Sequence, residues 1–169
     1  MDLSTREFWA LIHGLILGGG FLVAFAGGLA GLYSLKPGLV TEAGIGERTR
    51  RLVAGTTAMA AIAWVTVITG TWIVYPWYRE DNPESARSRL LEGSGTADWH
   101  EFGMEWKEHL AWLAPMLATA AAVIVLYYRA DLIRNQTARK LAIGLFVAAF
   151  AVAAIAGILG ALITKNASV

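Results

Sequence analysis

Two histidines, His13 and His109, lie where an imidazole could bind a metal or cofactor inside a membrane. His13 precedes Leu35, the end of its apolar segment, by 22 residues, and His109 precedes Arg129 by 20 residues. At about 1.5 Å per helical residue, these separations correspond to about 33 Å and about 30 Å. If the two helices run in the same direction, both imidazoles reach the same depth. Two imidazoles at one depth can hold a haem iron between two helices.

Four segments without Asp, Glu, Lys or Arg must position these histidines. They cover residues 8–35, 52–78, 109–128 and 141–164. Each reaches the roughly 20 residues that cross the hydrocarbon core of a bilayer. Only helices and closed barrels satisfy their backbone in lipid, and these segments are too long for barrel strands. The sequence therefore predicts an all-α bundle of four transmembrane helices.

We expect one integral membrane domain over residues 1–169. Its helices are predicted at about 8–35, 52–76, 100–128 and 140–163, with an outer loop at about 77–99.

Basic residues predict which loops face the inside of the membrane. The loops after the first and third helices together contain eight Lys or Arg and three Asp or Glu, whereas the rest of the chain has six bases and ten acids. The positive-inside rule then places these two loops inside, and both termini and the loop near 77–99 on the outer, periplasmic side. The expected protein is multi-pass and lies in a bacterial inner membrane.

Several small or basic residues share the depth or the helix face of His13. Counted from the inner ends of their helices, Gly70 and Gly160 lie close to the depth of the two histidines. Gly20 follows His13 by seven residues on the same helix face, where it would leave room for a flat macrocycle. Arg6 lies two turns further out and could meet a haem propionate. Glycine stripes also serve helix packing, and an interfacial arginine can simply anchor a helix.

The third histidine, His100, belongs to a dense segment at the start of the third helix. It lies about 13 Å further out than His109 by helical rise, so it should not share the same iron. His100 and Met104 are four residues apart and share a face, and a thioether with an imidazole suits copper. Glu105 also precedes His109 by four residues and could orient its ring. An amphipathic helix with solvated charges explains the same residues.

Composition limits the cofactors that the chain can hold. The sequence contains no cysteine and three histidines. Disulfides, thiolate metal sites and c-type haem attachment are therefore excluded. Two haems with paired histidine ligands are excluded within one chain, while one haem is possible. Nothing in the sequence indicates a nucleic-acid partner.

The arrangement resembles the small four- and five-helix membrane cytochromes of b type, including the haem-bearing membrane anchors of respiratory complexes. The resemblance is carried by His13, His109, Arg6 and the glycines at the histidine depth, and it concerns architecture across the whole chain rather than a signature motif. It implies one b-type haem held by His13 and His109 near the outer face. It also implies a non-catalytic electron-transfer subunit of a larger respiratory or photosynthetic complex, with other membrane and outer-side subunits, lipid and quinone as partners.

Three other readings fit the same residues. The first is a structural subunit without a cofactor, whose histidines pack or contact lipid or quinone. The second is a chlorophyll-type pigment protein, in which one imidazole per pigment suffices. The third is a copper-handling membrane protein that uses His100, Met104 and His109.

Overall fold

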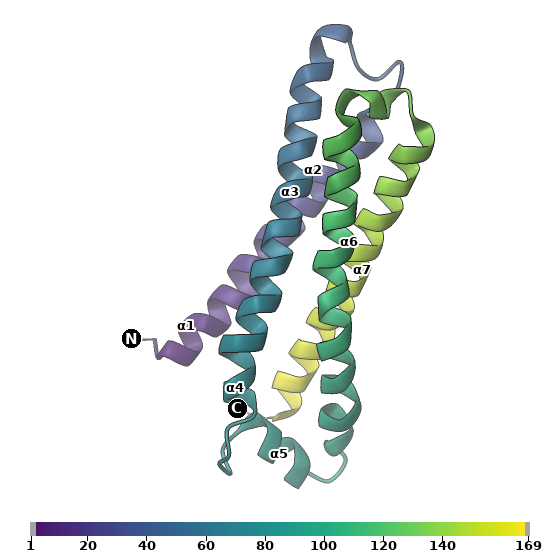
Figure 1. Cartoon of the computed structure of the whole chain (residues 1–169). Helices are drawn as coiled ribbons and strands as arrows, with labels where there is room; N and C mark the ends of the chain where they lie inside the picture. Colours follow the sequence, from purple (N-terminus) through teal and green to yellow (C-terminus); the bar gives the residue numbers. More distant parts are fainter. Residues whose placement is uncertain (1–2, 168–169) are drawn as a thin grey trace.

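The chain is an all-α bundle, shown in Figure 1 as a computed structural model that describes residues 3–167. It contains four helical segments long and apolar enough to cross a membrane. The four-helix transmembrane bundle predicted from the sequence is thereby confirmed. The four segments are Thr5–Ser34, Glu42–Tyr78, Trp99–Ile133 and Gln136–Ala167.

Three of these segments combine several kinds of helix. The first consists of α1 (Thr5–Leu11), the π-helical turn η1 (Ile12–Leu17) and α2 (Gly18–Ser34). The second consists of the 3₁₀ turn η2 (Glu42–Gly44), α3 (Ile45–Thr69), the π turn η3 (Gly70–Val74) and α4 (Tyr75–Tyr78). The third consists of the π turn η4 (Trp99–Met104), α6 (Glu105–Tyr128) and the 3₁₀ turn η5 (Arg129–Ile133). The fourth is α7 (Gln136–Ala167).

The helices extend beyond the predicted boundaries. The second segment becomes regular α-helix at Ile45 rather than near residue 52, and α7 begins at Gln136 rather than near residue 140. Absence of charge marks the part of a helix that lies in lipid, whereas the backbone hydrogen bonds continue into water. The loop near 77–99 contains the short helix α5 (Ala86–Glu92), which Ser85 caps.

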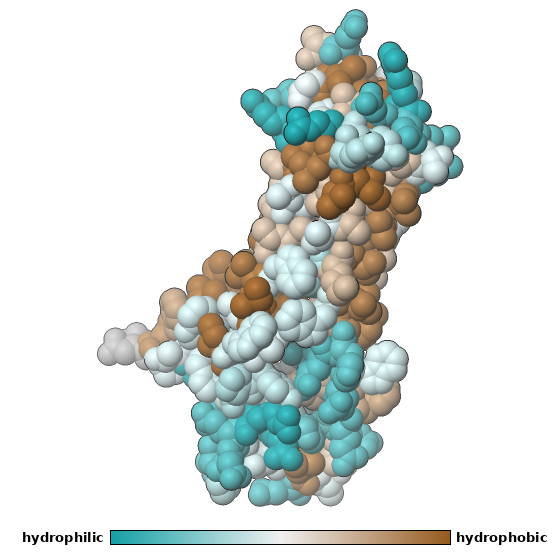
Figure 2. Space-filling view, in the orientation of Figure 1, coloured by the Kyte–Doolittle hydropathy of each residue, from teal (hydrophilic) through white to brown (hydrophobic). Residues whose placement is uncertain are grey.

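Consecutive segments are neighbours in the bundle. The helix α3 packs against both α2 and α6, α6 packs against α7, and α7 also touches α2. The start of α1 and the end of α7 lie toward the end that carries α5 (Figure 1). Following the predicted orientation, we call this end the outer end, and the end with the α2–α3 and α6–α7 connections the inner end. A hydrophobic band between two hydrophilic ends fits a membrane-spanning position (Figure 2).

The core draws on α2, α3, α6 and α7, and its aromatic part lies where α2 meets α7. The ring of Phe25 stacks on Phe146 and Phe150, with centroids 5.5 and 4.0 Å away. Phe146 is fully buried, and it approaches α2 at Gly28. A methyl group at Gly28 would lie 2.6 Å from Phe146 Cζ, so only glycine permits this contact without a shift. The buried core thus depends on one glycine facing one aromatic ring.

The outer half of the first segment is packed much less tightly. No residue of α1 or η1 is buried, and the main tertiary partners of these two elements are η3 and α3. Figure 1 shows α1 leaning away from α7 toward the outer end. Leu11, Leu15 and Ile16 are exposed there. This part of the bundle is therefore open sideways to the lipid.

A buried arginine joins the two inner connections. Arg139, 6% exposed, lies in the first turn of α7. Its Nη1 donates hydrogen bonds to the carbonyls of Leu35, Leu132 and Ile133 at 3.0, 2.9 and 3.1 Å. Leu35 follows α2, while the other two carbonyls belong to η5. A single guanidinium therefore satisfies three carbonyls at helix ends, where intrahelical donors are missing.

Candidate functional site

His13 is held at the junction of the first and second segments. Its Nδ1 lies 3.2 Å from Thr69 Oγ1. The hydroxyl hydrogen of Thr69 is used, because this hydroxyl donates to the carbonyl of Val65 at 2.8 Å. Thr69 Oγ1 must then accept, so His13 Nδ1 carries the ring hydrogen. The second nitrogen, Nε2, keeps its lone pair and can accept a hydrogen bond or ligate a metal.

The imidazole of His13 packs against η3 at Gly70, where the absence of a side chain leaves room for the ring. A methyl group at Gly70 would lie 2.8 Å from His13 Cε1, which is closer than a real contact allows. The sequence placed Gly70 at the depth of His13, and the two residues do touch. The glycine makes room for the histidine ring itself rather than for a macrocycle.

Replacement of Gly70 by alanine is expected to displace His13 from Thr69. Because α1 is loosely packed, the helix should yield, and the loss of stability should be small, about 1 kcal/mol. The nitrogen-15 chemical shifts of labelled histidine in micelles will report the change, since the protonated Nδ1 signal of His13 should be lost or averaged. Gly14→Ala is the control, because a methyl group at Gly14 meets nothing within 4 Å. An unchanged His13 signal in Gly70→Ala would contradict the contact.

Lys107, which the sequence analysis missed, supplies the cation of this site. It is partly buried, and its charge is one of the electrostatic influences on the ring of His13. The side-chain stem packs over Gly160, where a methyl group would lie 3.0 Å from Lys107 Cε. Within residues 3–167, Lys107 forms no ion pair or hydrogen bond, and the carboxylate of the neighbouring Glu108 acts both on its charge and on the hydroxyl of Tyr75. An unpaired ammonium in a transmembrane segment is a functional candidate.

His109 is not brought to His13 in this chain. Its side chain is exposed, and its Nδ1 donates to the backbone carbonyl of Glu105, one turn earlier, at 2.7 Å. It follows Lys107 by two positions, and this turns the two side chains about 200° apart on a helix. Since Lys107 packs over Gly160 of α7, His109 points away from that interface. It lines a surface hollow of about 380 Å³ on α6 with Glu105, Trp106, Leu110 and Leu113.

The remaining residues of the predicted haem site also lie apart. Arg6 is exposed on α1. Gly20 packs on α3, where a methyl group would lie 3.4 Å from Ile62 Cδ1. Gly160 contacts Lys107 from α7. These placements give two local contacts, His13 with Gly70 and Lys107 with Gly160, and leave Arg6, Gly20 and His109 outside both.

His100 and Met104 take part in sealing the outer end. Arg87 Nε donates to His100 Nε2 at 3.3 Å, and His100 Nδ1 lies 2.7 Å from the Tyr78 hydroxyl. Both ring nitrogens therefore have partners. Met104 is buried with Tyr78 and Leu90 in a small apolar cluster under α5. A copper ion on this pair would have to displace these contacts.

Sequence reasoning located the depth of the site but missed two of its members. Lys107 precedes the charge-free run that begins at His109, so it was counted with the outer loop. Lys107 could have been found from its distance to Arg129 along the sequence, because this distance equals the distance between His13 and Leu35. Thr69, directly before Gly70, carried no signal, because hydroxyls in transmembrane helices commonly bond to their own backbone.

The described residues contain no preformed cluster of metal ligands. Across residues 3–167, no group of three or more His, Cys, Asp or Glu side chains is placed to hold a metal ion. What these residues offer is a lone pair on His13 Nε2 and an ammonium on Lys107, and no residue of α1 or η1 is buried. No protein family, curated protein or solved structure matches this chain.

Proposed function

We propose that this chain is a membrane subunit that binds the headgroup of a quinone or quinol near its outer end and serves a larger electron-transfer assembly. The observation that carries the proposal is the free acceptor His13 Nε2, and it is supported by Lys107, whose ammonium has no ion-pair partner among residues 3–167 and whose charge acts on the same ring. A quinol hydroxyl can donate to the imidazole, and a quinone oxygen can accept from the ammonium. One headgroup with two opposite oxygens can use both contacts.

The packing of the first segment supports access from the bilayer. The exposed side chains of Leu11, Leu15 and Ile16 line the loosely packed outer half of the first helix. An isoprenoid tail can lie along these side chains in lipid while its headgroup reaches the imidazole of His13 in η1.

Lys107 would also make the binding of the headgroup depend on the redox state of the quinone. As a quinone accepts electrons, negative charge grows on its oxygens, and an ammonium in a medium of low dielectric constant stabilises that charge. The chain itself binds and orients the headgroup. Electrons would be exchanged with a redox centre of a partner subunit.

Binding of a decyl-substituted benzoquinone to the purified protein in nanodiscs tests the proposal. Removing either polar partner is expected to weaken binding about tenfold, so His13→Gln and Lys107→Met should each raise the dissociation constant by that factor. Quenching of tryptophan fluorescence measures the binding. His109→Gln is the matched control and should leave the constant unchanged. A folded His13→Gln variant that binds like the parent would refute the site.

One b-type haem is the second candidate, favoured by the bond between His13 Nδ1 and Thr69. Histidines that ligate iron usually donate their other nitrogen to such a partner. His109 faces away in this chain, so the second axial ligand would come from a neighbouring chain. A dithionite-reduced minus oxidised spectrum of the native complex decides between the candidates. A sharp reduced α band that is lost in His13→Ala and retained in His100→Ala supports haem ligation by His13.

A further inference from the structure

A hollow at the inner end of the bundle lies far from the proposed quinone site. It has a volume of about 530 Å³ and lies between the first turns of α3 and the end of α6. Two guanidiniums, those of Arg50 and Arg129, stand on its walls, and the other wall residues carry no charge. The lining consists of Gly46, Thr49, Arg50, Val53, Arg129 and Ala130.

Arg129 has a backbone conformation that an arginine rarely adopts. Its φ is 45° and its ψ is −120°, and among residues 3–167 it is the only residue other than glycine with positive φ. Such a conformation costs free energy that a glycine would largely avoid. It also ends α6 and sets the guanidinium beside the hollow. A strained backbone of this kind points to a role for the side chain.

Thr49, another wall residue, has a hydroxyl without a hydrogen-bond partner. The residue is 9% exposed, and its Oγ1 is buried and unpaired. The hydroxyls of Thr56 and Thr66 in the same helix instead donate to the carbonyls of residues one turn earlier, at 2.9 and 2.7 Å. A small rotation of the Thr49 side chain would give its hydroxyl to a ligand in the hollow. An unsatisfied hydroxyl therefore adds a third polar group to the two arginines.

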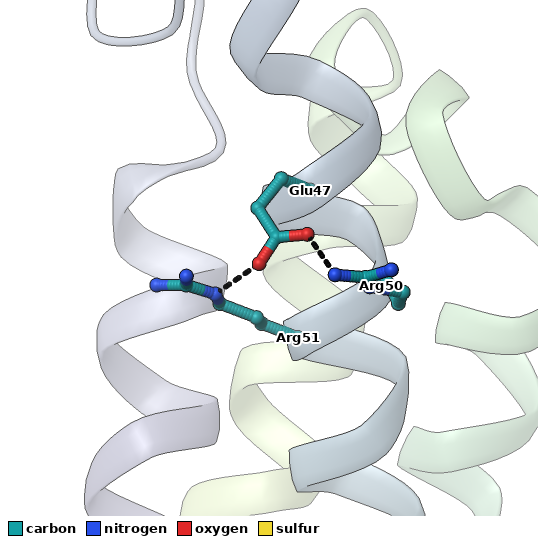
Figure 3. A network of polar contacts seen from close by, with 3 residues as sticks. All are labelled: Glu47, Arg50 and Arg51. Carbon is teal, nitrogen blue, oxygen red and sulfur yellow. Dashed lines mark hydrogen bonds and ion pairs between the residues drawn. The ribbon is translucent and has the colours of Figure 1, made fainter.

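The charge of the hollow remains positive despite one nearby carboxylate. Glu47 accepts a hydrogen bond from Arg50 Nη2 at 2.5 Å and one from Arg51 Nε at 2.6 Å (Figure 3). One carboxylate between two guanidiniums, with Arg129 opposite, leaves an excess of positive charge. Arg50 is 79% exposed and keeps further N–H groups that are not used by Glu47.

We propose that this hollow binds the phosphate of an anionic phospholipid. Guanidiniums are the preferred partners of phosphate oxygens, because their N–H groups match two oxygens at once. Val53 and Ala130 give the hollow an apolar part, and at this end of the molecule the hydrophilic surface meets the hydrophobic band (Figure 2). A lipid phosphate lies at that level, with its acyl chains along the band. In the predicted orientation, the site faces the leaflet that is rich in anionic lipid.

Native mass spectrometry of the delipidated full chain in detergent tests the proposal. Phosphatidylglycerol is expected to bind at least about tenfold more tightly than phosphatidylcholine with the same acyl chains. Arg50→Gln and Arg129→Gln should each weaken the binding of phosphatidylglycerol about tenfold. Arg134→Gln removes the same charge from an exposed position at the same end, and it should change the constant less than twofold. Equal losses in all three variants would mean general charge attraction and would overturn the site.

Two further measurements serve as controls. The first distinguishes a lipid phosphate from free phosphate, and the second distinguishes the loss of the Arg129 guanidinium from a loss of folding. If millimolar inorganic phosphate displaces phosphatidylglycerol, the hollow binds free phosphate and the lipid assignment is wrong. Arg129→Gly removes the guanidinium and also relieves the backbone, so without lipid its melting temperature should match or exceed that of the parent. The same variant should lose most of the thermal stabilisation that phosphatidylglycerol gives the parent. Full lipid stabilisation in Arg129→Gly would refute the role of Arg129.

Discussion

Replacing the buried Arg139 by methionine is expected to lower the free energy of unfolding by about 3–5 kcal/mol. The guanidinium donates to the carbonyls of Leu35, Leu132 and Ile133, and it connects the end of α2 with η5. Methionine fills a similar volume but leaves all three carbonyls without this donor. Buried carbonyls without partners carry most of the predicted cost.

Thermal unfolding in detergent micelles, followed by circular dichroism, measures this effect. Arg139→Lys should be intermediate, since an ammonium has donors but lacks the planar geometry of the guanidinium. The control is Arg134→Met, which removes an exposed arginine from the same connection and should change the melting temperature little. If Arg139→Met is no less stable than Arg134→Met, the three hydrogen bonds do not support the inner end.

The substitution Gly28→Leu is expected to destabilise the bundle by about 2–3 kcal/mol. Its first side-chain carbon alone would lie 2.6 Å from Phe146 Cζ. Phe146 cannot move aside easily, because it is fully buried and stacks against Phe25 at 5.5 Å. The contact between α2 and α7 must therefore open to admit the new side chain.

The adjacent glycine gives a matched control for this effect. Gly27 is exposed, and a methyl group there meets nothing within 4 Å. Gly27→Leu should be neutral or slightly stabilising, because leucine favours helix more than glycine does. Chemical unfolding of both variants in micelles measures the difference. Equal stabilities would show that the aromatic core accommodates a side chain at Gly28.

The sequence predicted the depth of residues in the membrane better than their direction. Distances along a charge-free helix placed Gly70 at the depth of His13, and the two residues touch. The same counting could not show that His109 points away from the interface of α6 with α7, because depth along a helix leaves rotation about its axis undetermined. Lys107, two residues earlier, has the opposite direction and packs over Gly160 of α7. Only the packing of side chains against η3 and α7 determines how each helix is rotated about its axis.

The sequence also did not show which charged residues are exposed and which are buried. The count of basic residues that predicted the inner side treated Arg139 and Arg134 alike. In the structure Arg134 is exposed, while Arg139 is buried and bonded to the backbone. The carbonyls that hold Arg139 lie in Leu35 and η5, far apart along the chain. A local sequence pattern cannot predict hydrogen-bond partners that only the fold brings close to Arg139.

The π turns of the first three segments make the chain sensitive to the deletion of a single residue. All three lie toward the outer end, at η1, η3 and η4. A π turn amounts to one extra residue within an α-helix. Deleting a single residue, such as Gly14, would restore ordinary helix in η1 and rotate all of α1 by about 100° relative to α2. The loss of one codon could thus re-aim the outer part of the helix while leaving its inner half in place.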